Sequence, residues 1–390
     1  MSRQSDRMVL LAFGGLLSLA VCIGVSRFVY TPILPFMETG LGISKPDAGL
    51  LASANYLGYL LGALFGTRRD LAGSPRRWFL TSLVTCAFTT LAMGLTTNFE
   101  IFLGLRLIGG ITSAFVMVFG STLILSRLAL NNRSGLAALH FAGVGTGIAL
   151  SSMLIITVER FSVDWQGMWI ASGILSFLIV PFIFYLVPPV SAAGEQTAAK
   201  EPLHYSRPLK ALILSYFLLG CGYIITATFL STLVRQLPDV QWMQSYIWLI
   251  VGLAAMPSVA FWSWISLRVG NRRSYSFAGF AMAMGVTASV LGDGPIVLSL
   301  AAILLGGTFM GMTALGLVEA RNMVPDHARQ ILAVMTLAVG VGQIVGPIFA
   351  GFVHGIFGNF VMASLTAAAG IIIASLMVWR KPAPAGDPHP

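Results

Sequence analysis

The sequence predicts an all-helical protein that crosses a membrane many times. Of its 390 residues, 56% are hydrophobic and only 9% are charged, and its mean hydropathy is +0.85. An ordinary soluble domain carries about 25% charged residues, so a water-soluble chain of this composition could not cover its apolar side chains. The apolar residues also form runs of roughly 20, the length that a helix needs to span a bilayer, and not the short alternating segments of a membrane barrel.

Twelve such runs predict twelve transmembrane helices. They cover residues 8–36, 47–66, 77–96, 99–125, 134–157, 166–187, 208–234, 243–266, 274–291, 296–319, 331–354 and 359–379. The three cysteines, Cys22, Cys86 and Cys221, all fall inside these runs. We therefore expect no disulfide framework, no metal site and no cofactor.

The distribution of basic residues predicts the orientation in the membrane. With the N-terminus inside, the inner segments carry eighteen of the 23 Lys and Arg residues, and the outer segments carry only Lys45, Arg160 and Arg235. Cytoplasmic loops are enriched in Lys and Arg, so we expect both termini in the cytoplasm. The net charge of +9 then reflects topology, and it does not indicate a surface for nucleic acid.

The polar connection at residues 188–207 predicts a cytoplasmic linker between two six-helix halves, 1–187 and 208–390. It is rich in Ala, Pro and small polar residues, which is typical of a flexible linker. Three glycine motifs recur across it at an offset of 197 residues, with Gly109–Gly110 matching Gly306–Gly307, Gly143 and Gly145 matching Gly340 and Gly342, and Gly73 matching Gly270. Two parallel six-helix repeats are the architecture of the major facilitator transporters.

Short motifs strengthen this resemblance to the major facilitator superfamily, which extends over nearly the whole chain. The loop "GTRRDLAGSPRR" is similar to the superfamily signature G-x-x-x-D-R-x-G-R-R, with its paired arginines displaced by two positions, and "RLIGG" is similar to R-x-x-Q-G. More narrowly, "GVSRFVYTPILP" and "GCGYIITATFL" resemble the YbfB/YjiJ-type branch. The resemblance implies a cytoplasmic latch between the halves, formed by Gly66, Asp70, Gly73, Arg76 and Arg77. The alternative is that these arginines only set the topology.

Two arginines, Arg27 and Arg106, lie inside predicted membrane helices, where an ionisable side chain is costly and usually faces the interior of the bundle. At 1.5 Å per residue, they lie roughly 13 Å and 10 Å below the outer surface. Every acidic residue falls in a loop or near a helix end. Because arginine binds carboxylates and phosphates through paired hydrogen bonds, the missing negative charge is predicted to be the substrate's. Alternatively, Arg27 reaches the interface or pairs with Glu38, and Arg106 bonds helix carbonyls.

Further candidates for the substrate site are polar-tipped residues of spans one, two, seven and eleven that could complete it: Tyr30, Asn55, Tyr56, Tyr59, Tyr223, Thr226 and Gln343. Glu319 is the candidate for proton coupling. Symport of a proton with the anion, exchange of anions and facilitated transport all stay open.

These observations predict a secondary active transporter that moves a small organic anion, a carboxylate, by alternating access. We expect a monomer in the lipid bilayer of the bacterial inner membrane. Within transporters, the alternative is efflux of amphipathic drugs or metabolites. From another class, the alternative is a non-transporting sensor or assembly factor with the same fold. An enzyme is not expected, because no Ser/His/Asp, Cys/His or metal-ligand cluster and no phosphate-binding loop appears.

Overall fold

Helices make up nearly the whole of the computed structural model, which describes residues 2–66, 68, 71–189 and 203–379, and no strand occurs in these ranges. Eleven helices are long and apolar enough to cross a membrane, and one bent pair can form a twelfth span. The predicted fold class is therefore confirmed, and each predicted span lies within a few residues of an observed one. The chain is a multi-pass membrane protein.

The first six spans include two with internal breaks. Span one consists of α1 (Ser2–Leu19), the π-helix η1 (Ala20–Val25) and α2 (Tyr30–Leu41). Span four consists of α5 (Phe99–Gly120), the π-helix η3 (Ser121–Leu125) and α6 (Ser126–Leu130). The other spans are α3 (Lys45–Gly66), α4 (Pro75–Ala92) with η2 (Met93–Leu95), η4 (Ser134–Leu136) with α7 (Ala137–Glu159), and α8 (Trp165–Leu186).

Six further spans follow the linker. They are α9 (Arg207–Arg235), the pair α10 (Tyr246–Ala255) and α11 (Ser258–Val269), α12 (Asn271–Leu291), α13 (Pro295–Met323), α14 (Ala328–Phe357) and α15 (Val361–Trp379), with short 3-10 turns at η5 (Pro238–Met243) and η6 (Pro325–His327). The sequence predicted one continuous helix over 243–266, but the chain bends by 42° between α10 and α11. Pro257 lies at this bend and has no N–H to continue the helical hydrogen bonds.

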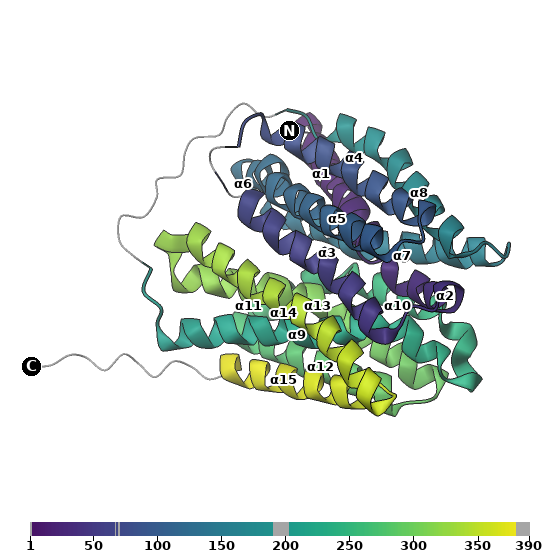
Figure 1. Ribbon diagram of the computed structural model, residues 1–390. Coiled ribbons are helices and arrows are strands. Elements are labelled where there is room, and N and C mark those ends of the chain that lie inside the picture. Colours follow the sequence, from purple (N-terminus) through teal and green to yellow (C-terminus); the bar gives the residue numbers. More distant parts are fainter. Residues whose placement is uncertain (1, 67, 69–70, 190–202, 380–390) are drawn as a thin grey trace, which may run out of the picture.

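The helices before and after the linker lie side by side and meet along two long contacts (Figure 1). Helix α3 packs along α14, and α7 packs along α10, while α2 also contacts α9. Small residues allow these approaches. A Cβ atom on Gly145 of α7 would lie 2.5 Å from the backbone nitrogen of Met256, so only glycine fits there.

One pair of glycines that the internal repeat aligns, Gly73 and Gly270, shares a positive φ. Gly73 has φ of 105° just before α4, and Gly270 has φ of 86° just before α12. L-residues other than glycine rarely adopt such angles. The two loops therefore share a local geometry as well as a sequence pattern.

Candidate functional site

The first span is interrupted near the middle of its own length, at the motif that contains Arg27. The N–H of Phe28 bonds the carbonyl of Ile23 at 3.2 Å, five residues back, and residues 26–29 form a turn before α2 begins. Pro32 explains part of this break, because it has no N–H with which to bond the carbonyl of Phe28. Broken helices and π-bulges often occur at the binding sites of transporters.

Arg106 is bound to the backbone around this break. Its side chain is 3% exposed, and its Nε donates to the carbonyl of Leu51 at 3.2 Å. Its Nη1 lies 3.4 Å from the carbonyl oxygens of both Ser26 and Arg27. The guanidinium also lies 4.8 Å from the centre of the Tyr30 ring. The side chain thus joins α5 to α3 and to the turn. These bonds agree with the alternative given above, in which Arg106 bonds helix carbonyls.

Arg27 is equally buried but has fewer polar partners. It is 4% exposed, and its Nη2 donates to Ser113 Oγ at 3.2 Å. Its guanidinium carbon lies 3.9 Å from the ring centre of Tyr59 and 5.5 Å from that of Tyr56, both on α3. Within the described part of the chain, its Nε has no hydrogen-bond partner. Stacking on tyrosine faces attracts a cation but leaves its N–H groups free to donate.

No carboxylate among the described residues forms an ion pair with either arginine. Glu38, the partner that the sequence offered for Arg27, instead bonds Lys45 and Thr232. The two arginines therefore leave a positive charge inside the first six spans.

Tyr30 and Asn55 support the geometry around Arg106. The Tyr30 hydroxyl donates to the carbonyl of Ala48 at 2.8 Å, and Asn55 Nδ2 donates to the carbonyl of Arg106 at 2.9 Å. Asn55 also lines a cavity of about 10 Å³ between Ser26 and Arg106. That volume is close to the room that one water molecule needs. The Tyr30 hydroxyl and the Asn55 amide nitrogen thus act within the protein, whereas Asn55 Oδ1 is buried without a hydrogen-bond partner among the described residues.

The candidates after the linker form a second group. Gln343 Nε2 bonds the hydroxyl of Tyr223, and the Tyr223 ring stacks on Phe309 with centroids 5.5 Å apart. Thr226 is buried, and its hydroxyl has no hydrogen-bond partner among the described residues. Phe28 of span one contacts two rings of the second half. Its ring centre lies 5.9 Å from that of Trp248 and 6.2 Å from that of Phe309.

Sequence reasoning missed Phe28, Trp248 and Phe309. Phe28 adjoins Arg27 in a motif that the sequence had singled out, so its position offered a signal. Trp248 and Phe309 offered none, because aromatic residues occur throughout the apolar runs.

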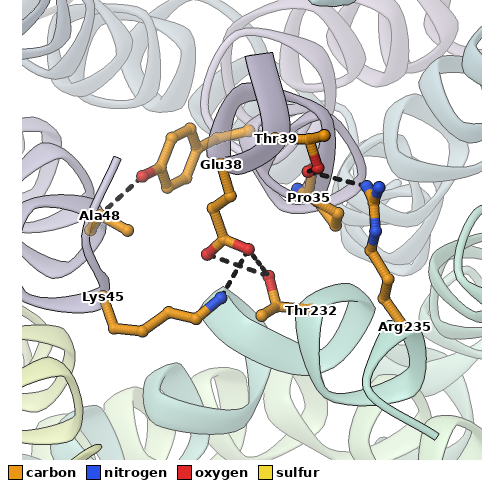
Figure 2. A network of polar contacts seen from close by, with 8 residues as sticks. Pro35, Glu38, Thr39, Lys45, Ala48, Thr232 and Arg235 are labelled. Atoms are coloured by element: carbon orange, nitrogen blue, oxygen red, sulfur yellow. Dashed lines mark hydrogen bonds and ion pairs between the residues drawn. The ribbon is translucent and has the colours of Figure 1, made fainter. Parts of the chain in front are cut away.

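A polar network joins the two halves at one end of the bundle (Figure 2). The charge pattern predicts that this end lies outside, and we call it the outer end. Lys45 Nζ lies 2.6 Å from a Glu38 carboxylate oxygen, and Thr232 of α9 donates to the same carboxylate at 3.3 Å. Arg235 Nη1 donates to the carbonyl of Pro35 at 2.7 Å. That carbonyl also accepts a hydrogen bond from the hydroxyl of Thr39 at 3.0 Å, within the same helix α2.

A second polar contact joins the outer ends of α7 and α10. Ser245 Oγ donates to Glu159 at 2.6 Å, Gln244 Nε2 donates to the other oxygen of that carboxylate at 3.4 Å, and Arg160 Nη2 bonds the Tyr246 hydroxyl at 3.4 Å. Together with the contact of Thr31 Oγ1 with the Ala227 carbonyl at 2.7 Å, these bonds hold the outer ends of the halves together.

The predicted latch residues are only partly described. Asp70 lies outside the described residues. Arg76 donates through Nε to the carbonyl of Val187 at 2.9 Å and through Nη2 to that of Phe184 at 2.8 Å, so it binds the end of α8 in its own half. Gly73 supplies the turn described above, Gly66 ends α3, and the backbone N–H of Arg77 is capped by Ser74. A latch between the halves stays a prediction.

Glu319, the candidate for proton coupling, forms an ion pair. Its Oε1 lies 2.6 Å from Arg272 Nε, so it joins α13 to the start of α12. A carboxylate with such a partner can serve as a structural link or as a group whose protonation releases the arginine. Proton coupling through Glu319 stays a prediction.

Twelve spans, a broken first helix beside two buried arginines and an interface built from α3, α14, α7 and α10 define a transporter of the major facilitator type. The chain belongs to the family described as "Uncharacterised MFS-type transporter YbfB", whose sequence model matches residues 19–379. The predicted superfamily and branch are thereby confirmed.

Individual relatives agree with this assignment. An uncharacterised MFS-type transporter of Yersinia pestis is 26% identical over 45% of this chain and 46% of its own length. Protein spinster of Drosophila melanogaster is 25% identical over 52% of this chain and 34% of its own length. A gallate transporter of Pseudomonas putida is 27% identical over 40% of this chain and 34% of its own length. The alignments thus span a third to a half of these relatives.

A solved structure matches the fold. The nucleoside transporter NupG superimposes with a TM-score of 0.73 and 16% identity, over 95% of this chain and 98% of NupG. A point mutant of NupG gives a TM-score of 0.75 with 17% identity over the same shares of both chains. Identity this low shows the fold alone. The family and this structural neighbour are transporters, not enzymes.

Proposed function

We propose that this protein is a secondary active transporter that moves a small organic anion, a carboxylate, by alternating access. The observation that carries the proposal is the state of Arg27. This side chain is buried at mid-membrane depth, has no ion-pair partner in the described ranges, and keeps an unbonded Nε.

The chemistry of Arg27 favours an anion over a cation. A buried guanidinium without a counter-ion repels cations and stabilises a negative charge brought next to it. Its planar group can bind both oxygens of a carboxylate. Tyr56 and Tyr59 hold the guanidinium by its face, so its donating edge stays available to a ligand.

One relative supports the same direction. The Pseudomonas putida protein that aligns with part of this chain is named a gallate transporter, and gallate is an organic anion. The alignment covers 40% of this chain, so it suggests a class of substrate and not gallate itself.

Alternating access would use the contacts at the outer end. In the observed state, Thr232, Ser245 and Ala227 of the second half bond to Glu38, Glu159 and Thr31 of the first. Opening of the site to the outside would have to break these bonds, while the long contacts of α3 with α14 and of α7 with α10 act as the surfaces on which the halves rock.

The setting follows from the charge pattern. We propose that the protein works as a monomer in the bacterial inner membrane, with both termini and the linker in the cytoplasm, because the basic residues gather on those segments. A cysteine introduced at Gly194 should then stay unlabelled by a membrane-impermeant reagent in intact cells.

The test is a binding screen of purified full-length protein in lipid nanodiscs. Acetate, succinate, benzoate and a cationic dye are titrated by calorimetry, and any ligand found is then followed as a radiolabelled solute in proteoliposomes. We expect a carboxylate to bind and to be taken up. Arg27→Gln should weaken its binding by about tenfold or more, since a hydrogen bond to a charged group contributes about 1.5–3 kcal/mol. Arg7→Gln, which removes an exposed arginine of α1, is the matched control and should bind normally.

Other outcomes identify the alternatives. Binding of the cationic dye but of no carboxylate would reject the proposal in favour of drug efflux. A carboxylate that binds but is never transported would indicate a sensor. An Arg27→Gln variant that transports the anion at the parental rate would show that this arginine does not select the charge.

A further inference from the structure

The turn in span one places two neighbouring side chains on opposite sides of the interface between the halves. Arg27 points to Ser113 and Tyr59, within the first six spans. Phe28 contacts Trp248 of α10 and Phe309 of α13, within the last six. Two adjacent residues of this turn therefore carry a cation that contacts the first half and an aromatic ring that contacts the second.

The rings around Phe28 form a defined aromatic wall. Its ring centre lies 5.9 Å from Trp248 at 56° and 6.2 Å from Phe309 at 73°, and Phe309 in turn stacks on Tyr223 at 5.5 Å and 16°. Tilted and edge-to-face contacts at such distances are the favourable geometries of aromatic pairs. We define Trp248, Phe309 and Tyr223 as the aromatic wall.

Trp248 also keeps an unused hydrogen-bond donor. The residue is 1% exposed, and its Nε1 has no hydrogen-bond partner in the described part of the chain. A buried indole N–H normally finds an acceptor, and one without it is destabilising. Together with the unbonded Nε of Arg27, this gives two orphaned donors, one on the residue before Phe28 in the chain and one on a ring that contacts Phe28.

We propose that the substrate is an aromatic carboxylate, whose carboxylate binds Arg27 and whose ring packs against the aromatic wall in the place that the Phe28 ring takes in the observed state. An oxygen substituent on the ring would accept from Trp248 Nε1. This inference rests on the proposed transport of organic anions and narrows it to planar aromatic ones. Phe28 becomes a specificity-determining residue, because the substrate must displace it.

The experiment compares two acids of equal charge and similar size on the purified full-length protein in nanodiscs. Benzoate is flat and aromatic, whereas cyclohexanecarboxylate is puckered and saturated. Calorimetry should give a dissociation constant about three- to tenfold lower for benzoate, since an aromatic pair contributes about 0.5–1.5 kcal/mol beyond its area. A hydroxyl at the 4-position should strengthen binding further, and Trp248→Phe should remove only that gain.

Variants at the wall and at Phe28 should act in opposite directions. Trp248→Leu should abolish the preference for benzoate, while Phe28→Ala should strengthen benzoate binding because no ring has to be displaced. Trp264→Leu, at a half-exposed tryptophan of α11 away from the wall, is the matched control and should change neither acid. Thermal melting of each variant checks that it is folded, and Phe309→Leu, which removes another ring of the aromatic wall, serves if the Trp248→Leu variant is not.

The results distinguish this inference from the proposed transport of organic anions on which it rests. Equal binding of the two acids by the parent protein would overturn the aromatic assignment and leave organic-anion transport standing. A benzoate preference that survives in Trp248→Leu, or a Phe28→Ala variant that binds benzoate no more strongly than the parent protein, would also overturn it. Failure of every carboxylate to bind, with a cationic dye bound, would overturn both.

Discussion

Arg27 and Arg106 are both buried arginines of the first six spans, yet their surroundings differ. Arg106 donates to three backbone carbonyls, those of Leu51, Ser26 and Arg27. Arg27 donates to one hydroxyl, lies over two tyrosine rings and keeps an unbonded Nε among the described residues. The first side chain is occupied by the fold, and the second is available.

This difference separates a positioning residue from a ligand-binding one. The contacts of Arg106 hold the backbone at the turn from which Arg27 and Phe28 extend. Carbonyl groups cannot neutralise a guanidinium fully, but here they accept from its Nε and Nη1. We therefore expect substitution of Arg106 to affect stability first, and substitution of Arg27 to affect binding first.

The largest effect is expected for Arg106→Gln. It removes the hydrogen bonds of a charged donor group to three backbone carbonyls, and each such bond contributes about 1.5–3 kcal/mol. The melting temperature in detergent should fall clearly, and the yield of folded protein should fall with it. If the variant melts like the parent protein and only loses affinity for the anion, Arg106 is itself a ligand and the two arginines are alike.

Arg27→Lys should give a smaller, purely functional effect. The lysine keeps the positive charge, but its ammonium cannot present two parallel N–H groups to a carboxylate. Binding of the anion should weaken by about tenfold with an unchanged melting temperature, because one charged hydrogen bond is lost. Calorimetry and thermal melting of the same preparation provide the measurement. A lysine variant of parental affinity would show that charge alone is recognised.

The smallest effect is expected for Glu38→Gln, which tests whether the site of Arg27 opens to the outside. Replacing the carboxylate that accepts from Thr232 of the other half should favour outward opening by roughly two- to fivefold, since an intramolecular hydrogen bond contributes about 0.5–1.5 kcal/mol and the amide keeps part of it. A cysteine introduced at Ser113, beside Arg27, should then react faster with an impermeant reagent added outside. The native Cys86, packed against the Gly109 carbonyl on the helix that carries Arg106, should not.

Glu100→Gln is the control for that experiment, because it removes an exposed carboxylate at the start of α5. Peptide mass spectrometry reports the labelling of each cysteine separately. If Cys86 becomes as reactive as the residue at position 113, both arginine sites open together and the distinction between them disappears.

The sequence predicted the architecture well because membrane insertion depends on a local property. A run of about 20 apolar residues must cross the bilayer as a helix, whatever its neighbours are. It also identified Arg27 and Arg106, since a charge within such a run is visible without a structure. The break at residues 26–29 was less visible, although Pro32 offered a signal that a helix over 8–36 could not be continuous.

By itself, the sequence determined the twelve spans, their expected orientation and two cations without acidic neighbours. Only the tertiary structure decided that Arg106 donates to three backbone carbonyls while Arg27 donates to none in the described ranges, and that Phe28 meets Trp248 across the interface. The physical reason is that hydropathy is summed along contiguous residues, whereas the partners of a side chain depend on the packing of helices far apart in the chain. Residues 28 and 248 are neighbours only because α10 and the turn of span one are packed together by the whole bundle.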